Sequence, residues 1–111
     1  MGVVHHKVGE GADWRWEDVK VEGYTTNKAT KQVLIGEQEG APNFVMRYFT
    51  IPPRSFSSLD RHEREHGVMI MNGRARVMLG DRFEDVGPGD VVFIPGWERH
   101  QFENLTDEPF T

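Results

Sequence analysis

The sequence predicts an all-β fold in one domain, either a sandwich or a barrel. Runs of four to nine residues rich in β-branched and aromatic side chains alternate with turns along the chain, which is typical of short strands. No segment of the sequence carries the apolar repeat of about 3.6 residues that predicts an amphipathic helix. A chain of 111 residues is long enough for a single hydrophobic core.

Residues 1–30 are expected to form an N-terminal arm, and residues 31–111 the barrel. The arm is polar, and its alternating pair Trp14 and Trp16 favours packing onto the body of the domain. Within the arm, VKVEGYTT (19–26) is a possible edge strand.

The barrel is predicted to begin with two strands, KQVLIG (31–36) and NFVMRYFTI (43–51), joined by the turn EQEGAP (37–42). Arg47 interrupts the second of these apolar runs. Its side chain either faces a cavity as an anchor for an anion or forms an ion pair at the surface or at an interface. Strand parity counted from one end leaves both alternatives open.

Later in the chain, GVMIM (67–71) and RARVML (74–79) flank the dipeptide Asn72-Gly73. Asn-Gly between two strand-like runs predicts a β-hairpin, because both residues tolerate a positive φ. Three more strand-like runs follow, separated by turns: DRFEDV (81–86), VVFIP (91–95) and WERHQFENL (97–105).

The string HEREH, from His62 to His66, matches H-E-x-x-H, in which two histidines on one face of a helix bind zinc in metalloproteases. The flanking residues do not favour a helix. Gly67 follows at once, and Val68 and Ile70 favour β-structure. The chain also leaves little room for a substrate-binding subdomain, so we set the protease interpretation aside.

A strand raises a different geometric problem for these two histidines. Residues four apart along an extended strand are ~13 Å apart. Two imidazole nitrogens on one metal ion, each bound at ~2.1 Å, must lie only ~3–4 Å apart. If His62 and His66 share an ion, the chain must therefore turn a corner at Glu63-Arg64-Glu65.

The spacing continues beyond HEREH in a regular way. Gly73 lies seven residues after His66, and GDVVFIPGWERHQFEN sets Pro95, His100 and Asn104 at fixed intervals after Gly89. These segments resemble the paired motifs of the cupin superfamily, G-x5-H-x-H-x3-4-E-x6-G and G-x5-P-x-G-x2-H-x3-N. The resemblance covers roughly residues 31–109, extends to small single-domain cupins, and implies a jelly-roll barrel, also called a double-stranded β-helix.

The resemblance also implies a set of metal ligands. His62 matches the second histidine of the first motif, His66 falls at its glutamate position, and His100 matches the histidine of the second motif. Asp60 stands at the first histidine position, and Trp97 replaces a glycine of the second motif.

Three neutral imidazoles suit one divalent transition-metal ion, Mn, Fe, Zn, Ni or Cu. Three protein ligands with open positions are typical of catalytic sites. Asp60 is a fourth ligand, a group that orients His62 or His100, or a solvated carboxylate. Glu65 would replace His66 if the corner slipped by one residue.

Strand parity suggests the wall of a substrate pocket. Val68 shares the face of His66, Phe102 shares the face of His100, and Arg47 joins them if it faces the cavity. We expect a metal-dependent enzyme with dioxygenase-type or Lewis-acid chemistry on a small, oxygen-rich substrate. The alternative is a non-catalytic cupin that binds a small ligand, for example as a sensor, and loss of the first histidine favours this alternative.

Composition limits the partners. The net charge is −5 and the basic residues are scattered, which argues against nucleic-acid binding. No apolar run approaches the ~20 residues of a membrane helix. The absence of cysteine and of a signal-peptide pattern leads us to expect a cytoplasmic protein. We also expect a homodimer, because the chain ends at EPFT, where a cupin would add a further strand and an uncovered edge would favour strand exchange.

Overall fold

The protein is described by a computed structural model covering residues 2–24 and 28–111, and its all-β architecture confirms the predicted fold class. These residues form ten strands and one short 3-10 helix: β1 Lys7–Val8, β2 Arg15–Trp16, β3 Val21–Gly23, β4 Thr30–Ile35, η1 Glu37–Glu39, β5 Met46–Thr50, β6 His66–Met69, β7 Ala75–Leu79, β8 Arg82–Val86, β9 Val91–Ile94 and β10 His100–Glu103. No helix among the described residues is long and apolar enough to cross a membrane.

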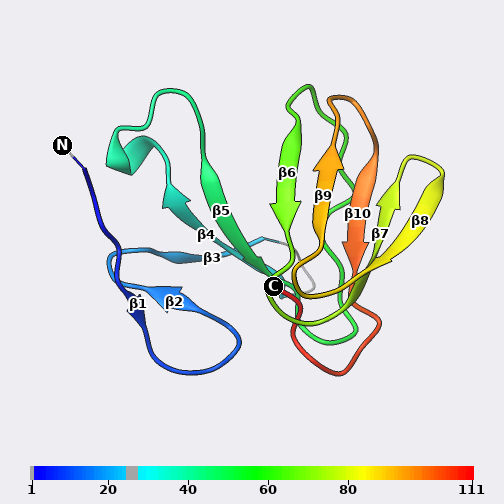
Figure 1. Ribbon diagram of the computed structural model, residues 1–111, viewed down its shortest axis with the longest axis horizontal. Coiled ribbons are helices and arrows are strands. Elements are labelled where there is room, and N and C mark those ends of the chain that lie inside the picture. The colour runs from blue at the N-terminus through cyan, green and yellow to red at the C-terminus, as the bar shows by residue number, and fades with distance from the viewer. Residues whose placement is uncertain (1, 25–27) are drawn as a thin grey trace.

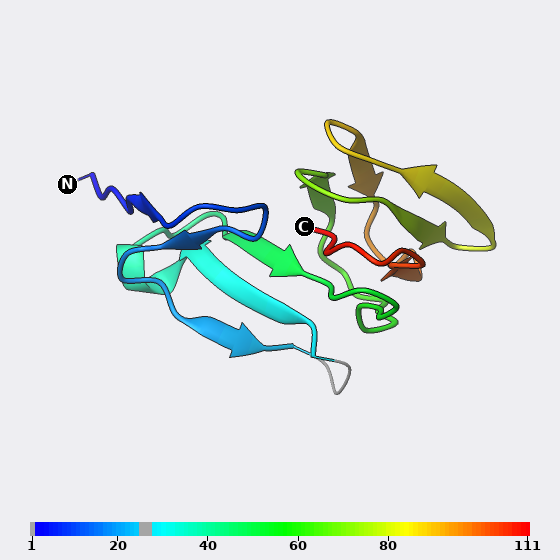
Figure 2. The same cartoon turned by 90° about the horizontal axis from the view of Figure 1, so that it is seen from below.

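The strands form antiparallel sheets that lie in two groups. On one side β5 pairs with β4, β4 pairs with β3, and β1 pairs with β2; on the other side β6 pairs with β9, and β7 lies between β8 and β10. Figure 1 shows β1 to β5 on the left and β6 to β10 on the right, and Figure 2 shows the same division from below.

The C-terminal residues connect the two groups. Phe110 pairs with Ile51, just after β5, through main-chain hydrogen bonds of 2.8 and 3.0 Å. Thr111 exchanges main-chain hydrogen bonds with Asn72, in the turn after β6. The residue after Asn72 must be glycine. Gly73 has a φ of 81°, and a Cβ at this position would meet the carbonyl oxygen of Pro109 at 2.3 Å. In both ribbon views the C-terminus accordingly lies between the two groups of strands (Figures 1 and 2).

The predicted hairpin at Asn72-Gly73 is wrong. β6 pairs with β9 and β7 pairs with β8 and β10, so the Asn-Gly turn carries the chain from one sheet to another. The turn residues do adopt the expected positive φ at Gly73, but their hydrogen bonds go to Thr111 rather than across a hairpin. The Gly-Asp turn at Gly80 does form a hairpin, since Leu79 is paired with Arg82.

The N-terminal arm packs against β5, as the alternating tryptophans predict. Trp14 stacks on Tyr48 with ring centroids 6.3 Å apart, and Trp16 meets the same ring edge-on at 5.0 Å. β3 is the edge strand of its sheet and corresponds to the centre of the segment 19–26, of which residues 25 and 26 lie outside the described part.

The core lies between the groups of strands and is almost entirely aliphatic. Its buried side chains come from both sides of the fold: Ala29, Ile51, Ile70, Ala75, Val77, Leu79, Val86, Val92, Ile94 and Phe110. One buried amide strengthens the junction, because Asn104 is fully buried and its Nδ2 donates to the carbonyl oxygens of Ile51, Pro52 and Glu108.

Candidate metal centre

The HEREH string forms a corner, as the hypothesis of a shared metal requires. Asp60 pairs with His100 through main-chain hydrogen bonds of 3.0 and 2.9 Å, so the chain is still extended at that point. Residues 61–65 belong to no strand, and β6 begins at His66. The corner brings two histidines four residues apart to the same place, which a straight strand cannot do.

The loop after β9 holds this corner in position. The main-chain N–H of Trp97 donates to the carbonyl oxygen of His62 at 2.6 Å, and Arg61 Nε donates to the carbonyl oxygen of Trp97 at 2.7 Å. Gly96 lies so close that a Cβ there would meet the carbonyl oxygen of Glu63 at 2.4 Å. The motif position that is glycine in cupins and Trp97 here has a φ of 68°, a conformation that favours glycine.

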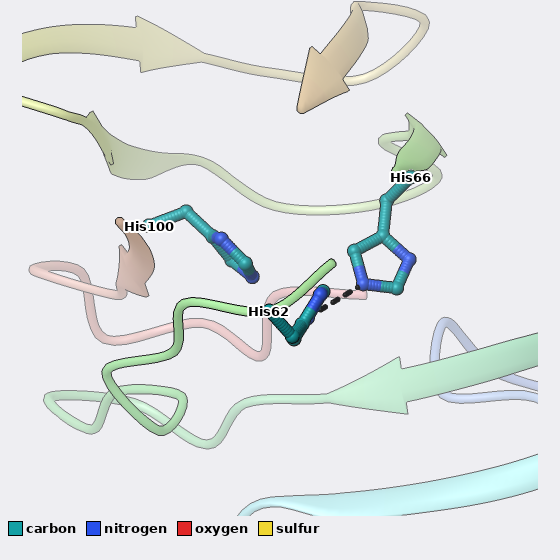
Figure 3. A group of neighbouring side chains, drawn as sticks. All are labelled: His62, His66 and His100. Carbon is teal, nitrogen blue, oxygen red and sulfur yellow. Dashed lines mark hydrogen bonds between the residues drawn. The ribbon is translucent and has the colours of Figure 1, made fainter. Parts of the chain in front are cut away.

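Three histidines from separate parts of the chain converge here (Figure 3): His62 from the corner, His66 from the start of β6 and His100 from the start of β10. Their potential ligand atoms all lie within 4.8 Å of one another. The Nε2 atoms of His62 and His66 are 3.0 Å apart, which is the separation that two ligands of one ion need.

The main chain fixes the tautomers of two of these rings. His62 Nδ1 lies 2.9 Å from the carbonyl oxygen of Arg64, and His100 Nδ1 lies 2.9 Å from that of Glu98. A carbonyl oxygen only accepts hydrogen bonds, so each Nδ1 carries the proton. In the neutral ring this leaves the Nε2 lone pair free for a metal ion, the arrangement that backbone carbonyls impose on metal-binding histidines.

The surroundings of the third ring, His66, favour its neutral form. Burial lowers the pKa of His66 below its usual value, and the positive charge of Arg47 lowers it further. A metal ion binds only the unprotonated imidazole, so a lowered pKa favours binding.

Asp60 lies outside this group of potential ligands, and so does the exposed Glu65. The carboxylate of Asp60 accepts hydrogen bonds from the hydroxyls of Ser58 at 2.6 Å and Tyr24 at 3.0 Å. The half-buried carboxylate is thus held by these two hydroxyls on the wall of the cavity, and the main chain of Asp60 is paired with that of His100.

Tyr24 and Ser58 were not identified from the sequence. Their hydroxyls lie 2.7 Å apart beside Asp60, and burial is the main cause that raises the pKa of the Tyr24 phenol. Tyr24 follows β3, far from the histidines in sequence, and Ser58 lies two residues before Asp60, outside the motif spacing. To find these two residues from the sequence, one would need to know that β3 lies next to the segment before Asp60 in the fold.

The histidines open into a cavity of about 810 Å³ between the two groups of strands. Val68 and Phe102 line it together with Arg47 and the three histidines. Arg47 lies on the same face of its strand as Phe49 and the buried Ile51, and its guanidinium carbon is 5.2 Å from the centre of the Phe49 ring. Arg47 thus lines the cavity as an exposed side chain, and it makes no ion pair with a carboxylate among the described residues.

Comparison with known proteins places this architecture in a family. A model of the cupin domain matches residues 47–111. A cupin 2 conserved barrel domain protein from Rhodopseudomonas palustris superposes with a TM-score of 0.79 at 30% identity, over 95% of this chain and 74% of that one. The polyketide cyclase RemF from Streptomyces resistomycificus gives a TM-score of 0.73 at 32% identity, over 84% of this chain and 69% of that one. These likenesses confirm the predicted jelly-roll barrel.

A curated relative is similar over most of this chain. The 1-methylthio-D-xylulose 5-phosphate methylsulfurylase of Rhodospirillum rubrum is 37% identical over 103 residues, which make up 87% of this chain and 65% of the relative. The chain therefore spans less than two thirds of the relative's length.

Proposed function

The chain belongs to the cupin superfamily, and we propose that it is a metal-dependent enzyme acting on a small, oxygen-rich molecule. The observation that carries the proposal is the group of His62, His66 and His100, whose ligand atoms lie within 4.8 Å of one another. Two of the rings are held by carbonyl oxygens in the tautomer that frees Nε2.

The donor set fits one divalent transition-metal ion. Three imidazoles suit Mn, Fe, Zn, Ni or Cu, and three protein ligands leave positions open for a substrate. Such an ion, when bound, supplies Lewis-acid activation of a substrate oxygen or, if redox-active, dioxygenase-type chemistry. The chain itself contributes neutral, preoriented imidazoles and an apolar wall that includes Val68 and Phe102, which limits water beside the substrate.

The names of the relatives support an enzyme and, within that, the Lewis-acid form. One relative is named a methylsulfurylase of a xylulose 5-phosphate derivative and another a polyketide cyclase, and neither name denotes a dioxygenase. Both names denote enzymes rather than sensors. We therefore place Lewis-acid chemistry first, dioxygenase-type chemistry second and a non-catalytic ligand-binding role third.

Metal analysis of protein purified without nickel resin tests the proposal. We expect about one transition-metal ion per chain, and loss of that metal in the variant His100→Ala. The matched control is His6→Ala, because His6 is exposed in the N-terminal arm. A metal-free wild-type protein that also fails to take up Mn, Fe, Zn, Ni or Cu would contradict the proposal.

A substrate screen on the metal-replete protein then separates the three forms. Turnover of phosphorylated ketoses without O₂ consumption supports the Lewis-acid form, and O₂ uptake with diketones or catechols supports the dioxygenase-type form. Saturable ligand binding without turnover supports the non-catalytic role.

We also propose a homodimer, in which a second copy covers the outer face of the β6–β9 sheet. Met69, Val91 and Phe93 are 60%, 68% and 60% exposed on that face, and Met69 and Val91 are directly paired across the strands. Apolar side chains gathered on one sheet face favour burial against a partner. Light scattering should give twice the chain mass for the wild type and a lower mass for Phe93→Asp.

A further inference from the structure

Arg47 is the positive charge on the wall of the cavity that faces the histidines. Its strand neighbours on the same face are Phe49 and the core residue Ile51, and the exposed side chain of Arg47 lines the cavity with both of them. The Phe49 ring lies 5.2 Å from the guanidinium carbon, close enough for a cation–π contact that orients the guanidinium plane.

Arg47 has no carboxylate partner among the described residues, although the chain has 18 acidic and only 13 basic side chains. Four other arginines do pair with a carboxylate within 4.0 Å: Arg15, Arg54, Arg76 and Arg82. In a protein with excess negative charge, an arginine without a carboxylate on a cavity wall has its strong hydrogen-bonding capacity available for a ligand.

The guanidinium also shares its cavity with the histidine group. Arg47, His66 and Tyr24 all line the same space. The negative group that faces the same space is Asp60, and its carboxylate is engaged by the hydroxyls of Tyr24 and Ser58. No ion pair joins Arg47 to Asp60.

We propose that Arg47 forms an oxyanion subsite of the cavity, which binds a phosphate or carboxylate group of the substrate while another oxygen of the same molecule reaches the three histidines. The planar guanidinium matches both oxyanions, because each presents two oxygens to its parallel N–H groups. The cavity of about 810 Å³ is large enough for a small molecule that spans the two sites. Only the histidine end of this inference rests on the proposed function.

The subsite is tested with inorganic phosphate and acetate on metal-free protein, prepared with a chelator and followed by calorimetric titration. We expect saturable binding by the wild type, weakened about tenfold or more in Arg47→Gln, because a charge-assisted hydrogen-bond pair is lost. Arg47→Lys should lie between the two, since lysine keeps the charge and loses the planar geometry. The stronger of the two anions identifies a phosphorylated or a carboxylated substrate.

Arg82→Gln is the matched control, because it removes an exposed arginine of β8 that does not line the cavity. We expect it to bind both anions like the wild type. The inference is overturned if the wild type binds neither anion saturably, or if Arg47→Gln binds them as well as Arg82→Gln does.

Metal content measured on the same variants separates this inference from the proposed function. Arg47→Gln should keep the metal content of the wild type, since Arg47 contributes no ligand atom to the histidine group. Anion binding that depends on Arg47 in a chain that takes up no metal would support the subsite and contradict the proposed function. Normal metal uptake together with anion binding that does not depend on Arg47 would support the proposed function and contradict the subsite.

Discussion

On the histidine wall of the cavity, formed by His62, His66 and His100, main-chain carbonyl oxygens fix two of the three rings, those of His62 and His100. On the arginine wall, formed by Arg47 and Phe49, the guanidinium has one ring contact and no ion pair among the described residues. The first arrangement suits a metal ion, whose ligands must be placed within a few tenths of an ångström. The arrangement on the arginine wall suits a ligand whose binding can be accompanied by an adjustment of the flexible Arg47 side chain.

The largest effect is expected at Asn104, which joins the end of β10 to the chain after β5 and so ties the two walls together. Asn104→Ala leaves the carbonyl oxygens of Ile51, Pro52 and Glu108 without this donor inside the protein. We expect a loss of about 2–4 kcal/mol in the free energy of unfolding, measured with urea. The exposed Asn43→Ala should stay within about 0.5 kcal/mol of the wild type.

A loss of stability for Asn104→Ala no larger than for Asn43→Ala would show that the buried amide does not connect the walls.

The burial of Asn104 also bears on a sequence motif. Asn104-Leu105-Thr106 matches a glycosylation acceptor, but the amide of Asn104 is fully buried and therefore not accessible.

The second prediction tests whether the corner must be held closely. Gly96→Ala would place a Cβ 2.4 Å from the carbonyl oxygen of Glu63, so the corner that carries His62 must shift. We expect metal affinity to fall about 10–100-fold, the usual cost of disturbing the residues that support metal ligands. The readout is competition with a chromophoric chelator.

Gly67→Ala is the matched control for Gly96→Ala. Gly67 follows a histidine directly, but a Cβ there would meet nothing within 4 Å. Its metal affinity should remain close to that of the wild type. Equal affinities for the two variants would mean that the corner tolerates displacement and that the histidine wall is less rigid than its contacts suggest.

The sequence predicted the histidine wall better than the arginine wall for a physical reason. A shared ion sets a limit on the distance between its ligands, and with that limit the four-residue spacing of His62 and His66 predicts a corner in the chain. No comparable limit applied to Arg47, and none brought Tyr24 to Asp60, because a hydrogen bond between residues far apart in the sequence leaves no spacing pattern in the chain.

The false hairpin at Asn72-Gly73 shows the complementary limit. The dipeptide reports only a local preference for positive φ, and Gly73 satisfies it. Which strands pair is decided by the packing of the whole barrel, which sends β6 to β9 and places Thr111 against Asn72.

The third prediction concerns strain on the histidine wall. Trp97 has a φ of 68° and a 58% exposed side chain whose ring lies 5.9 Å from the Arg61 guanidinium. Trp97→Ala and Trp97→Gly both remove the ring, and only the glycine variant removes the Cβ that disfavours this conformation. We expect Trp97→Gly to be more stable than Trp97→Ala by about 1 kcal/mol in urea unfolding. Equal stabilities would indicate that the loop relaxes once the ring is absent.

The smallest expected effect is the electrostatic influence of the arginine wall on the histidine wall. In the metal-free protein, burial is the main cause of the lowered pKa of His66, and the charge of Arg47 is a lesser cause. Arg47→Gln should therefore raise the pKa of His66 towards its usual value of 6.5 without reaching it, as followed by the NMR titration of the imidazole protons. The Arg82→Gln variant should leave the pKa of His66 unchanged.

The lowered pKa of His66 also makes the free energy of unfolding depend on pH. Because the folded state holds His66 below the pKa of 6.5 that it has when unfolded, the unfolded chain binds more protons in the window just below that pH. The free energy of unfolding of the metal-free wild type should consequently fall as the pH drops through 6.5 towards the folded pKa. In Arg47→Gln this fall should be shallower, because the folded and unfolded values are closer together. A pH dependence in Arg47→Gln as steep as in the wild type would mean that the arginine wall lies too far away, or is too well screened by water, to act on the histidines.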